Sequence, residues 1–267
     1  MFSLVADEYD QAGVEFFSRF GEDLVSVAQL QPGERVLDVG CGRGAVTFPA
    51  AGAVSETGSV DAIDIAPGMV ALLQRDVEKR AVRNVAVRVD DAEAPMVAEA
   101  SFDAVLASLV LFFLPDLKAA LRAYRVCLKP GGRLAFTTFG DSRPEWTAIE
   151  QRLTTYLRDD HPARSQPIGK PTTDSLASEA AIRATLERAG FTNVAIQERI
   201  YPTSYGTGEH FVRFTQTTGL RAIWDSIAPT RRAQAETELA AMADALRDTS
   251  GGLIEPVSIR FTLATNP

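Results

Sequence analysis

A carboxylate and three glycines form the part of this sequence best suited to chemistry. Asp38 lies at the end of a short apolar run, and glycines follow it at alternate positions: Gly40, Gly42 and Gly44. Glycine allows tight turns and lets a ligand approach the backbone closely. The helix expected behind these glycines starts with unpaired N–H groups and a positive dipole end. The pattern predicts a strand, a ligand-binding turn and a helix in succession.

Two classes of ligand suit this turn. Gly40, Gly42 and Ala45 satisfy the dinucleotide fingerprint G-x-G-x-x-G/A, which is typical of nicotinamide-dependent oxidoreductases. A carboxylate beside the turn would repel a pyrophosphate, whereas it suits a ligand with a cationic amino-acid end. Asp38 therefore favours the second class.

Three further polar residues follow expected strands. Asp64 lies near the end of a strand expected over 59–65, close to the roughly 20-residue spacing past Gly40 at which such sites place a carboxylate for ribose hydroxyls. Asp91 and Ser108 follow two more expected strands. In a parallel doubly wound sheet, ligands bind at the carboxyl ends of the strands. The sequence thus predicts that these residues and the glycine turn share one crevice.

Strands that alternate with helices of ten or more residues predict an α/β fold with a doubly wound, mostly parallel sheet. Up to residue 140 we expect helices over 12–30, 45–54, 68–80 and 117–128, and strands over 36–39, 59–65, 84–90, 102–107 and 133–139. Beyond it we expect helices over 145–158, 176–189, 209–227 and 230–247, a loop over 161–173, a flexible turn over 201–208, and strands over 191–199 and 257–265. The expected division is an N-terminal helical segment (1–30), a ligand-binding core (31–140), and cover helices with the last two strands of a seven-stranded sheet (141–267).

A set of motifs in fixed order resembles one family. They are Asp38 to Gly44, Asp64-Ile65-Ala66-Pro67-Gly68-Met69, Asp91-Ala92-Glu93, Ser101-Phe102-Asp103, the LFFLPD run at 111–116 and the LKPGGR run at 128–133. Together they resemble the class I S-adenosylmethionine (SAM)-dependent methyltransferases of the small-molecule, ubiquinone/menaquinone-biosynthesis-like group (methyltransferase type 11). The resemblance is close over about residues 20–140 and loose afterwards.

The resemblance implies SAM as the cofactor and a role for each motif. The turn, which also contains Cys41, would wrap the methionine end, and Asp38 would reach the amino group. Asp64 would bind the ribose hydroxyls, with Ile65 and Met69 flanking the adenine. The remaining implied contacts are Asp91 and Ala92 at the adenine amino group, and Ser108 near the methionine and sulfonium. Ile65 and Met69 also suit a plain core role, since Met often fills gaps between packed elements.

The acceptor side is less well defined by the sequence. Many relatives carry His-His where this chain has Phe112-Phe113, which removes two titratable groups and leaves the pocket more apolar. The cover helices carry apolar and aromatic side chains. The candidates for the acceptor pocket are Tyr9, Phe16, Phe112, His210, Phe211 and Phe214. His210 is a weak candidate for a general base, and Tyr9 and Tyr205 are weaker ones, so we expect proximity and orientation to carry most of the rate.

Composition limits the classes of partner. The chain of 267 residues has a net charge of −8 and a pI of about 4.9, which argues against a nucleic-acid backbone as partner. Two cysteines suggest neither a disulfide framework nor a zinc site, and no metal is expected. The acidic start does not resemble a signal peptide, and no apolar run is long enough to span a bilayer. We expect a cytoplasmic protein with a small-molecule acceptor, and a homodimer is possible.

The sequence therefore predicts a SAM-dependent methyltransferase that acts on an O, N or C atom of a small organic acceptor, aromatic or of natural-product type. Three alternatives stay open at this point. They are a nicotinamide-dependent oxidoreductase, a SAM-fold enzyme that catalyses a cyclisation or decarboxylation, and a SAM-binding regulator without catalytic activity.

Overall fold

The computed structural model describes residues 17–161 and 174–267. Seven strands form one sheet in the order β3-β2-β1-β4-β5-β7-β6. The strands are β1 (Arg35–Val39), β2 (Ser59–Asp64), β3 (Val85–Val89), β4 (Phe102–Ser108), β5 (Leu128–Phe139), β6 (Thr192–Tyr205) and β7 (Leu253–Thr265). β1 to β5 pair in parallel, and β7 runs antiparallel to both of its neighbours. The expected seven-stranded, mostly parallel sheet is confirmed.

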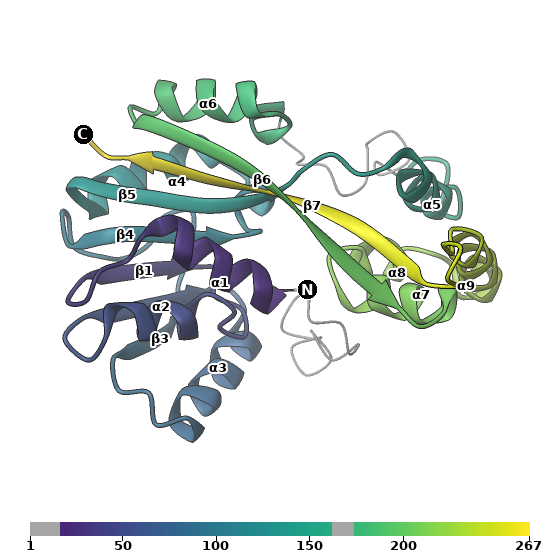
Figure 1. Cartoon of the computed structure of the whole chain (residues 1–267), viewed down its shortest axis with the longest axis horizontal. Coiled ribbons are helices and arrows are strands. Elements are labelled where there is room, and N and C mark those ends of the chain that lie inside the picture. Colours follow the sequence, from purple (N-terminus) through teal and green to yellow (C-terminus); the bar gives the residue numbers. More distant parts are fainter. Residues whose placement is uncertain (1–16, 162–173) are drawn as a thin grey trace.

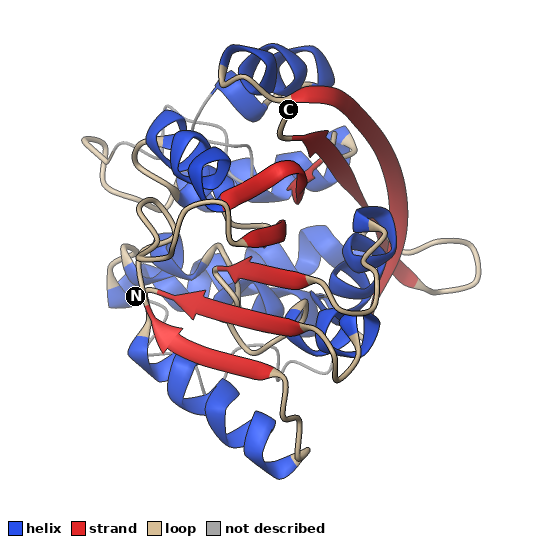
Figure 2. Cartoon of the chain, turned by 90° about the vertical axis from the view of Figure 1, so that its left-hand side faces the viewer, coloured by secondary structure: helices blue, strands red, loops and turns tan. Residues whose placement is uncertain are grey.

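Helices cover both faces of this sheet (Figure 2). α1 (Phe17–Ala28), α2 (Thr47–Val54) and α3 (Pro67–Lys79) pack on one face, and α4 (Leu117–Cys127) and α6 (Glu179–Arg188) on the other. β1 is buried on both faces: Val36 joins the cluster under α1 and α2, whereas Leu37 joins the cluster under α4. A strand covered on both faces is predominantly apolar, and Val36, Leu37 and Val39 show this pattern in the sequence.

The last two strands are longer than the sequence predicts. β6 and β7 pair residue by residue from Ile196 opposite Thr262 to Tyr205 opposite Leu253. The flexible turn expected over 201–208 is therefore wrong as far as Tyr205, because these residues form the far half of β6. Along this half, Tyr201, Thr203 and Tyr205 are buried and the residues between them are exposed. This alternation is typical of a strand, but the glycines at 206 and 208 favoured the prediction of a turn.

The ribbon formed by β6 and β7 extends past the rest of the sheet and carries a group of four helices (Figure 1). These are α5 (Pro144–Thr154), α7 (Gly208–Thr217), α8 (Arg221–Asp225) and α9 (Pro229–Asp244). We call them, with residues 201–205 and 253–257 of the ribbon, the cover. The single helix expected over 209–227 is wrong, because the chain breaks near Gly219 and forms α7 and α8.

Several expected features lie partly or wholly outside the described residues. α1 begins at Phe17, and the part of the expected 12–30 helix before it lies outside them. So do the pocket candidates Tyr9 and Phe16, and most of the expected 161–173 loop. In the described ranges, no helix has the length and apolar character needed to cross a membrane, and no cluster of His, Cys, Asp and Glu is suited to hold a metal ion.

Candidate functional site

The glycine turn after β1 contains two positions with opposite surroundings. Gly40 has φ of 65°, and a methyl group there would lie 2.4 Å from a methyl carbon of Val110, so packing of the protein itself requires glycine. Gly42 has φ of 50°, yet a methyl group there would meet nothing within 4 Å. The space beside Gly42 is therefore open to a ligand that approaches the backbone.

A cavity of about 270 Å³ opens beside this turn. Its wall contains Asp38, the turn from Gly40 to Gly44, the start of α2, and Ser108 at the end of β4. Helix α1 closes one side with Phe17, Ser18 and Glu22. The sequence did not single out these three residues, because nothing in a helical pattern says which ligand its exposed side will face.

Asp38 is the acid of this cavity. It is 1% exposed, and it accepts a hydrogen bond of 2.6 Å from Thr47 Oγ1. Burial raises the pKa of Asp38 to about 7, although the bond from Thr47 acts against this rise. A buried carboxylate without a cationic partner is costly to ionise, so a ligand that brings a positive charge would stabilise the ionised form.

Asp64 supports the turn from behind and is not part of the cavity wall. Its two carboxylate oxygens accept hydrogen bonds from the backbone N–H groups of Gly42 at 2.9 Å and Ala66 at 2.8 Å. Burial raises the pKa of Asp64, and these two bonds oppose that effect. Each oxygen still has a lone pair for a further donor. Asp64 thus shapes the turn and keeps the capacity to accept ligand hydroxyls.

The two apolar residues expected beside an adenine lie in different surroundings. Ile65 is 67% exposed, so the core interpretation of Ile65 is wrong. Met69 is buried in a small cluster with Ala66 and the partly buried Leu72. The core interpretation suits Met69, and only Ile65 offers a free apolar surface.

Two acids follow β3 and differ in function. Asp90 is buried and accepts hydrogen bonds from the backbone N–H groups of Asp91 and Met96, so it anchors the loop. Asp91 is exposed, with Oδ1 accepting from the N–H of Glu93. Ala92 is buried, and its carbonyl accepts the hydroxyl of Tyr124 at 2.7 Å. The loop is thus tied down on both sides of its exposed acid.

The end of β4 is fixed by Thr137 of β5. Ser108 Oγ lies 3.1 Å from Thr137 Oγ1, which also accepts the N–H of Leu109 at 2.9 Å. Leu109 has φ of 54°, a left-handed conformation that is strained for a branched side chain and is often found at functional sites. Thr137 therefore holds the chain where Ser108 enters the cavity wall.

Comparison with known proteins identifies the family. The family described as "Methyltransferase domain" matches residues 36–132. Nocamycin O-methyltransferase from Saccharothrix syringae is 33% identical over 281 residues, which cover 99% of this chain and 95% of that protein. The aklanonic acid methyltransferase DauC from Streptomyces sp. strain C5 is 44% identical over 164 residues, which cover 58% of this chain and 74% of that protein. The chain belongs to the SAM-dependent methyltransferases.

Solved structures agree with this assignment at the level of the fold. The YcgJ protein of Bacillus subtilis superposes with a TM-score of 0.63 at 14% identity, covering 92% of this chain and 98% of that chain. The predicted family and cofactor are confirmed, and the nicotinamide interpretation is not favoured. The finer grouping with ubiquinone and menaquinone enzymes stays a prediction.

Two features of the glycine turn suit a ligand with a cationic group. The buried Asp38 carboxyl lacks a cationic partner among the described residues, and the open space beside Gly42 admits a ligand. Gly44 and Cys41 contribute to the same wall. The Cys41 side chain itself packs among Ala62 and Leu73, and burial raises the pKa of its thiol, which disfavours the nucleophilic thiolate form.

The Phe112-Phe113 pair lies in a short 3-10 turn just after Ser108. The two rings pack against each other with centroids 4.6 Å apart, and Phe112 also contacts Phe139. Phe113 is 49% exposed, whereas Phe112 is half-buried and packs against both large apolar clusters of the sheet. The methyltransferase therefore presents an apolar, aromatic surface at this turn.

In the cover, Phe211 and Phe214 are buried against the ring of Tyr205, at centroid distances of 5.2 and 5.6 Å. Their packing shows that both residues stabilise the cover from inside, and a role as open pocket walls is not supported. His210 Nδ1 accepts the backbone N–H of Gly206 at 3.2 Å. The neutral imidazole therefore carries its proton on Nε2 and cannot act as a base through that atom.

Two carboxyl groups inside the cover were missed by sequence analysis. Burial and the nearby charge of Glu255 raise the pKa of Glu150 to about 8, and burial raises the pKa of Glu255 to about 7. Tyr205 donates a 2.7 Å hydrogen bond to Glu255. From the sequence alone, both acids are expected to be exposed to solvent. They become buried only because the ribbon packs against α5, a contact between segments far apart in the chain.

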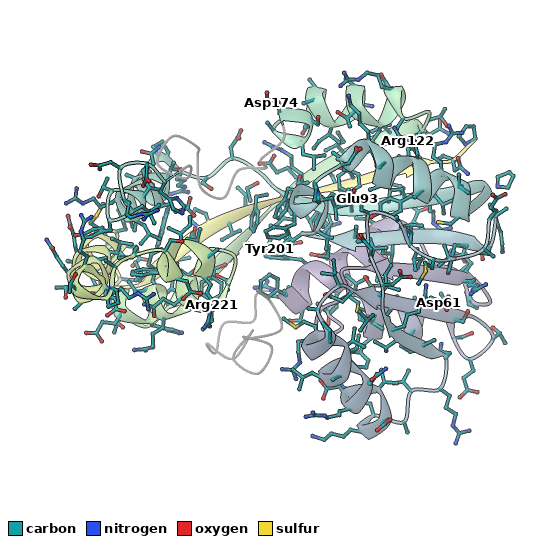
Figure 3. The ribbon with its side chains drawn as sticks, turned by 180° about the vertical axis from the view of Figure 1, so that it is seen from behind. Asp61, Glu93, Arg122, Asp174, Tyr201 and Arg221 are labelled. Carbon is teal, nitrogen blue, oxygen red and sulfur yellow. The ribbon has the colours of Figure 1, made fainter. Side chains whose placement is uncertain are left out.

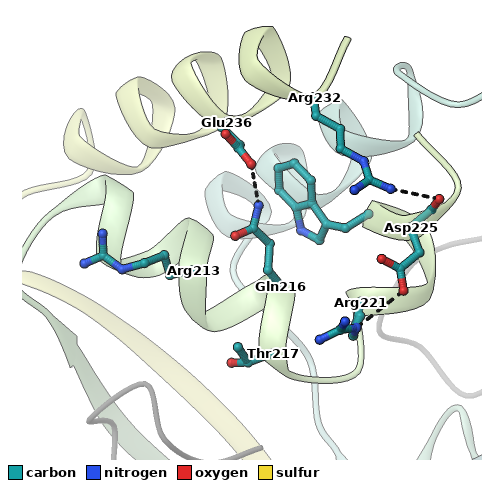
Figure 4. A pocket seen from close by; sticks show the side chains of 8 residues that line it. Arg213, Gln216, Thr217, Arg221, Asp225, Arg232 and Glu236 are labelled. Atoms are coloured by element: carbon teal, nitrogen blue, oxygen red, sulfur yellow. Dashed lines mark hydrogen bonds and ion pairs between the residues drawn. The ribbon is translucent and has the colours of Figure 1, made fainter. Parts of the chain in front are cut away.

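A second cavity, of about 390 Å³, lies between α7, α8 and α9 (Figure 4). Its charged groups largely bond one another or the backbone. Arg221 pairs with Asp225, Glu236 accepts from Gln216, and Arg232 donates to carbonyl oxygens of the α8–α9 connection. None of the predicted site residues lines this cavity, and no role is assigned to it.

Proposed function

We propose that the enzyme transfers the methyl group of SAM to an oxygen atom of a small natural-product acceptor held between the glycine turn and the cover. The relatives with this acceptor chemistry in their names are an O-methyltransferase and a methyltransferase of an organic acid. The first of them matches almost the whole chain, cover included. The observation that carries the proposal is the buried acid Asp38, which has no cationic partner among the described residues and lies in the wall of a cavity that Gly42 leaves open.

Each site residue has a proposed role toward SAM. Asp38 would bind the amino group of the methionine end, and Asp64 the ribose hydroxyls. Ile65 would cover one face of the adenine, and Asp91 would accept from its amino group. Ser108 would lie beside the methionine end, held by Thr137. Met69 would support Ile65 from below.

The chemistry asks little of a base. The sulfonium supplies an activated methyl group, and the protein must align the acceptor oxygen in line with the breaking C–S bond. Proximity and orientation contribute about 7–11 kcal/mol to such a reaction. An acidic oxygen, as in a carboxylic acid or a phenol, is already ionised or easily ionised near neutral pH. An acceptor of this kind suits a pocket in which Phe112 replaces a titratable group and His210 does not present a free basic nitrogen.

Each of the three expected parts of the chain has a proposed role in binding SAM or the acceptor. Residues 1–30 and 31–140 would hold SAM, because α1 and the strand ends together form the cavity wall. Residues 141–267 would enclose the acceptor and complete the sheet. The proposal includes a cytoplasmic location, the place where SAM is available, and it allows a homodimer, which light scattering on the purified protein would detect.

Mass spectrometry of reaction products tests the proposal. The enzyme is incubated with SAM and a panel of polyketide acids, phenols, amines and active-methylene compounds, each with and without enzyme. We expect a gain of one methyl group on an acid or phenol oxygen, together with stoichiometric S-adenosylhomocysteine (SAH). A methyl group found on nitrogen or carbon alone would contradict the proposed oxygen specificity. A rearranged product without methylation would favour the cyclase or decarboxylase alternative.

A further inference from the structure

Helix α1 touches the glycine turn through its backbone. A methyl group on Gly21 would lie 1.9 Å from the carbonyl oxygen of Ala45, which immediately follows the turn. Gly21 is fully enclosed although it lies in a helix. A helical glycine costs about 0.5–1 kcal/mol relative to alanine, and here it allows the two segments to meet without an intervening side chain.

The neighbouring residues of α1 hold the β6–β7 ribbon. Phe20 is buried and meets the ring of Tyr201 edge-on, with centroids 4.7 Å apart. Asp23 accepts the hydroxyl of Tyr201 and pairs with Arg199 at 2.7 Å. Figure 3 shows Tyr201 at the place where the cover joins the rest of the molecule.

The same turn of α1 also faces the cofactor cavity. Phe17, Ser18 and Glu22 line it, so residues 17–23 contact the cavity, the glycine turn and the ribbon at once. From Tyr201 the ribbon runs four residues on to Tyr205, which packs against Phe211 inside the cover. The buried residues of α1, the ribbon and the cover belong to one continuous apolar cluster.

We propose that Asp23 and Tyr201 are positioning residues that fix the cover relative to the cofactor cavity through α1, so that occupation of the cavity orders the cover for the acceptor. A ligand in the cavity touches α1 directly and restricts its movement. Tyr201 and Asp23 pass that restriction to the ribbon, because their hydrogen bond and the Arg199 ion pair join two segments far apart in sequence. The cover then meets the acceptor in one arrangement.

This proposal rests on the proposed function only in that SAH binds at the glycine turn. Its consequence is a coupling between cofactor and acceptor. Binding sites coupled in this way change each other's affinity by about 5- to 150-fold. Loss of the Tyr201–Asp23 contact should reduce that factor while the cofactor cavity itself stays intact.

The test is hydrogen exchange of the full chain with and without saturating SAH. In the unchanged protein we expect SAH to slow exchange in the glycine turn, in α1 and also in β6 and α7 of the cover. In Tyr201→Phe and Asp23→Ala we expect protection of the turn to remain and protection of α7 to fall at least severalfold. Alanine suits a helical position, so Asp23→Ala should fold.

Tyr156→Phe is the matched control. Tyr156 is a buried tyrosine whose hydroxyl also donates to a carboxylate, that of Glu238, but this contact joins the segment just after α5 to α9 and does not involve α1. We expect its response to SAH to match that of the unchanged protein. A merely stabilising role of the Tyr201 hydroxyl would give the same result in both tyrosine variants.

The outcomes separate the two proposals. If SAH fails to bind the unchanged protein, the cofactor assignment of the proposed function fails. If SAH binds but protects only the turn and α1, or if both variants keep full protection of α7, the positioning role is overturned. Protection of α7 that disappears in Tyr201→Phe and Asp23→Ala, but not in Tyr156→Phe, supports it.

Discussion

Thr47 donates a 2.6 Å hydrogen bond to the carboxylate of Asp38 across the glycine turn. Thr47 is the first residue of α2 and Asp38 lies in β1, so the bond closes the loop between strand and helix. It also fixes the direction of a carboxylate that is almost wholly buried. The acid is held in the cavity wall before any ligand arrives, which reduces the ordering that binding requires.

The pKa of Asp38, about 7 in the ligand-free protein, makes cofactor binding depend on pH. The amino group of SAH is cationic and favours the ionised acid, so binding below pH 7 must release a proton. We expect SAH affinity to rise by about fivefold from pH 6 to pH 7 and by about a further twofold to pH 8, where it levels off, because about a tenth of the group is ionised one pH unit below its pKa and about half at the pKa. Calorimetry in two buffers of different ionisation enthalpy measures the released proton.

Asp38→Asn provides the control for this linkage. The amide oxygen can still accept from Thr47, so the fold is retained, whereas the charge is lost. Its SAH affinity should be weak and independent of pH between 6 and 8. The stability of the ligand-free enzyme should change with pH in the opposite direction to SAH affinity. The pKa of Asp38 in the folded protein lies above the unfolded value of 3.8, so the stability that Asp38 contributes should be lost as pH rises from about 4 to about 7. A pH-independent affinity of the unchanged enzyme would remove Asp38 from the cofactor site.

Asp64→Ala should impair both binding and folding. Hydrogen bonds to a charged group contribute about 1.5–3 kcal/mol, so SAH should bind about 10- to 150-fold more weakly. The melting temperature should also fall, since the N–H groups of Gly42 and Ala66 lose their acceptor. Asp61→Ala is the control, because Asp61 lies on the same strand but pairs with Arg35 away from the cavity. Less than a twofold change of affinity in folded Asp64→Ala would exclude Asp64 from the site.

Gly42→Ala should separate binding from stability. The added methyl group would enter open space where the cofactor has to approach, so the loss of SAH affinity should greatly exceed the loss of stability. The left-handed backbone alone costs about 1–2 kcal/mol for alanine. Gly131→Ala carries the same backbone cost, with φ of 76° and nothing within 4 Å, but it lies outside the cavity wall. Thermal melts and SAH titrations of both variants should show similar stability and very different affinity; equal affinities would place the cofactor elsewhere.

Neither histidine should be indispensable. His210 Nδ1 accepts the N–H of Gly206, and His161 lines neither of the two cavities described above. We expect His161→Ala and His210→Ala each to reduce kcat by less than ~10², below the usual range for loss of a general base. Single-turnover rates across pH measure this. A thousandfold loss in His210→Ala, with SAH affinity intact and the pH dependence gone, would identify it as the base.

The first five strands and their connections follow from local patterns. In β1 the apolar residues Val36, Leu37 and Val39 surround Asp38, Pro67 opens α3, and the glycine turn separates β1 from α2, so each boundary has its own chemical signal. Parallel topology predicted that Ser108 meets the glycine turn at one cavity, whereas Asp64 and Asp91, expected in the same crevice, do not line it. The strands and turns could be predicted because each depends on residues close together in sequence, and the position of Ser108 could be predicted because parallel strands end at the same edge of a sheet.

The far half of the chain depends on contacts between distant residues. Tyr201 to Tyr205 form a strand because residues 253–257 pair with them, and two glycines nearby suggested a turn instead. In the sequence, Phe211 and Phe214 are equally compatible with a pocket wall and with the interior of the cover. Only the position of Tyr205 in the structure distinguishes these two roles. The role of α1 in closing the cavity depends on Gly21, which in the sequence is an unremarked glycine within a helix.

Titration of the purified enzyme with SAH and, separately, with NAD at pH 7.5 is the measurement that tests the central claim most directly. The buried acid beside the open Gly42 predicts one SAH site per chain, clear thermal stabilisation by SAH, and none by NAD. Stabilisation by NAD equal to or greater than that by SAH would contradict the assignment of this turn to the methionine end of SAM.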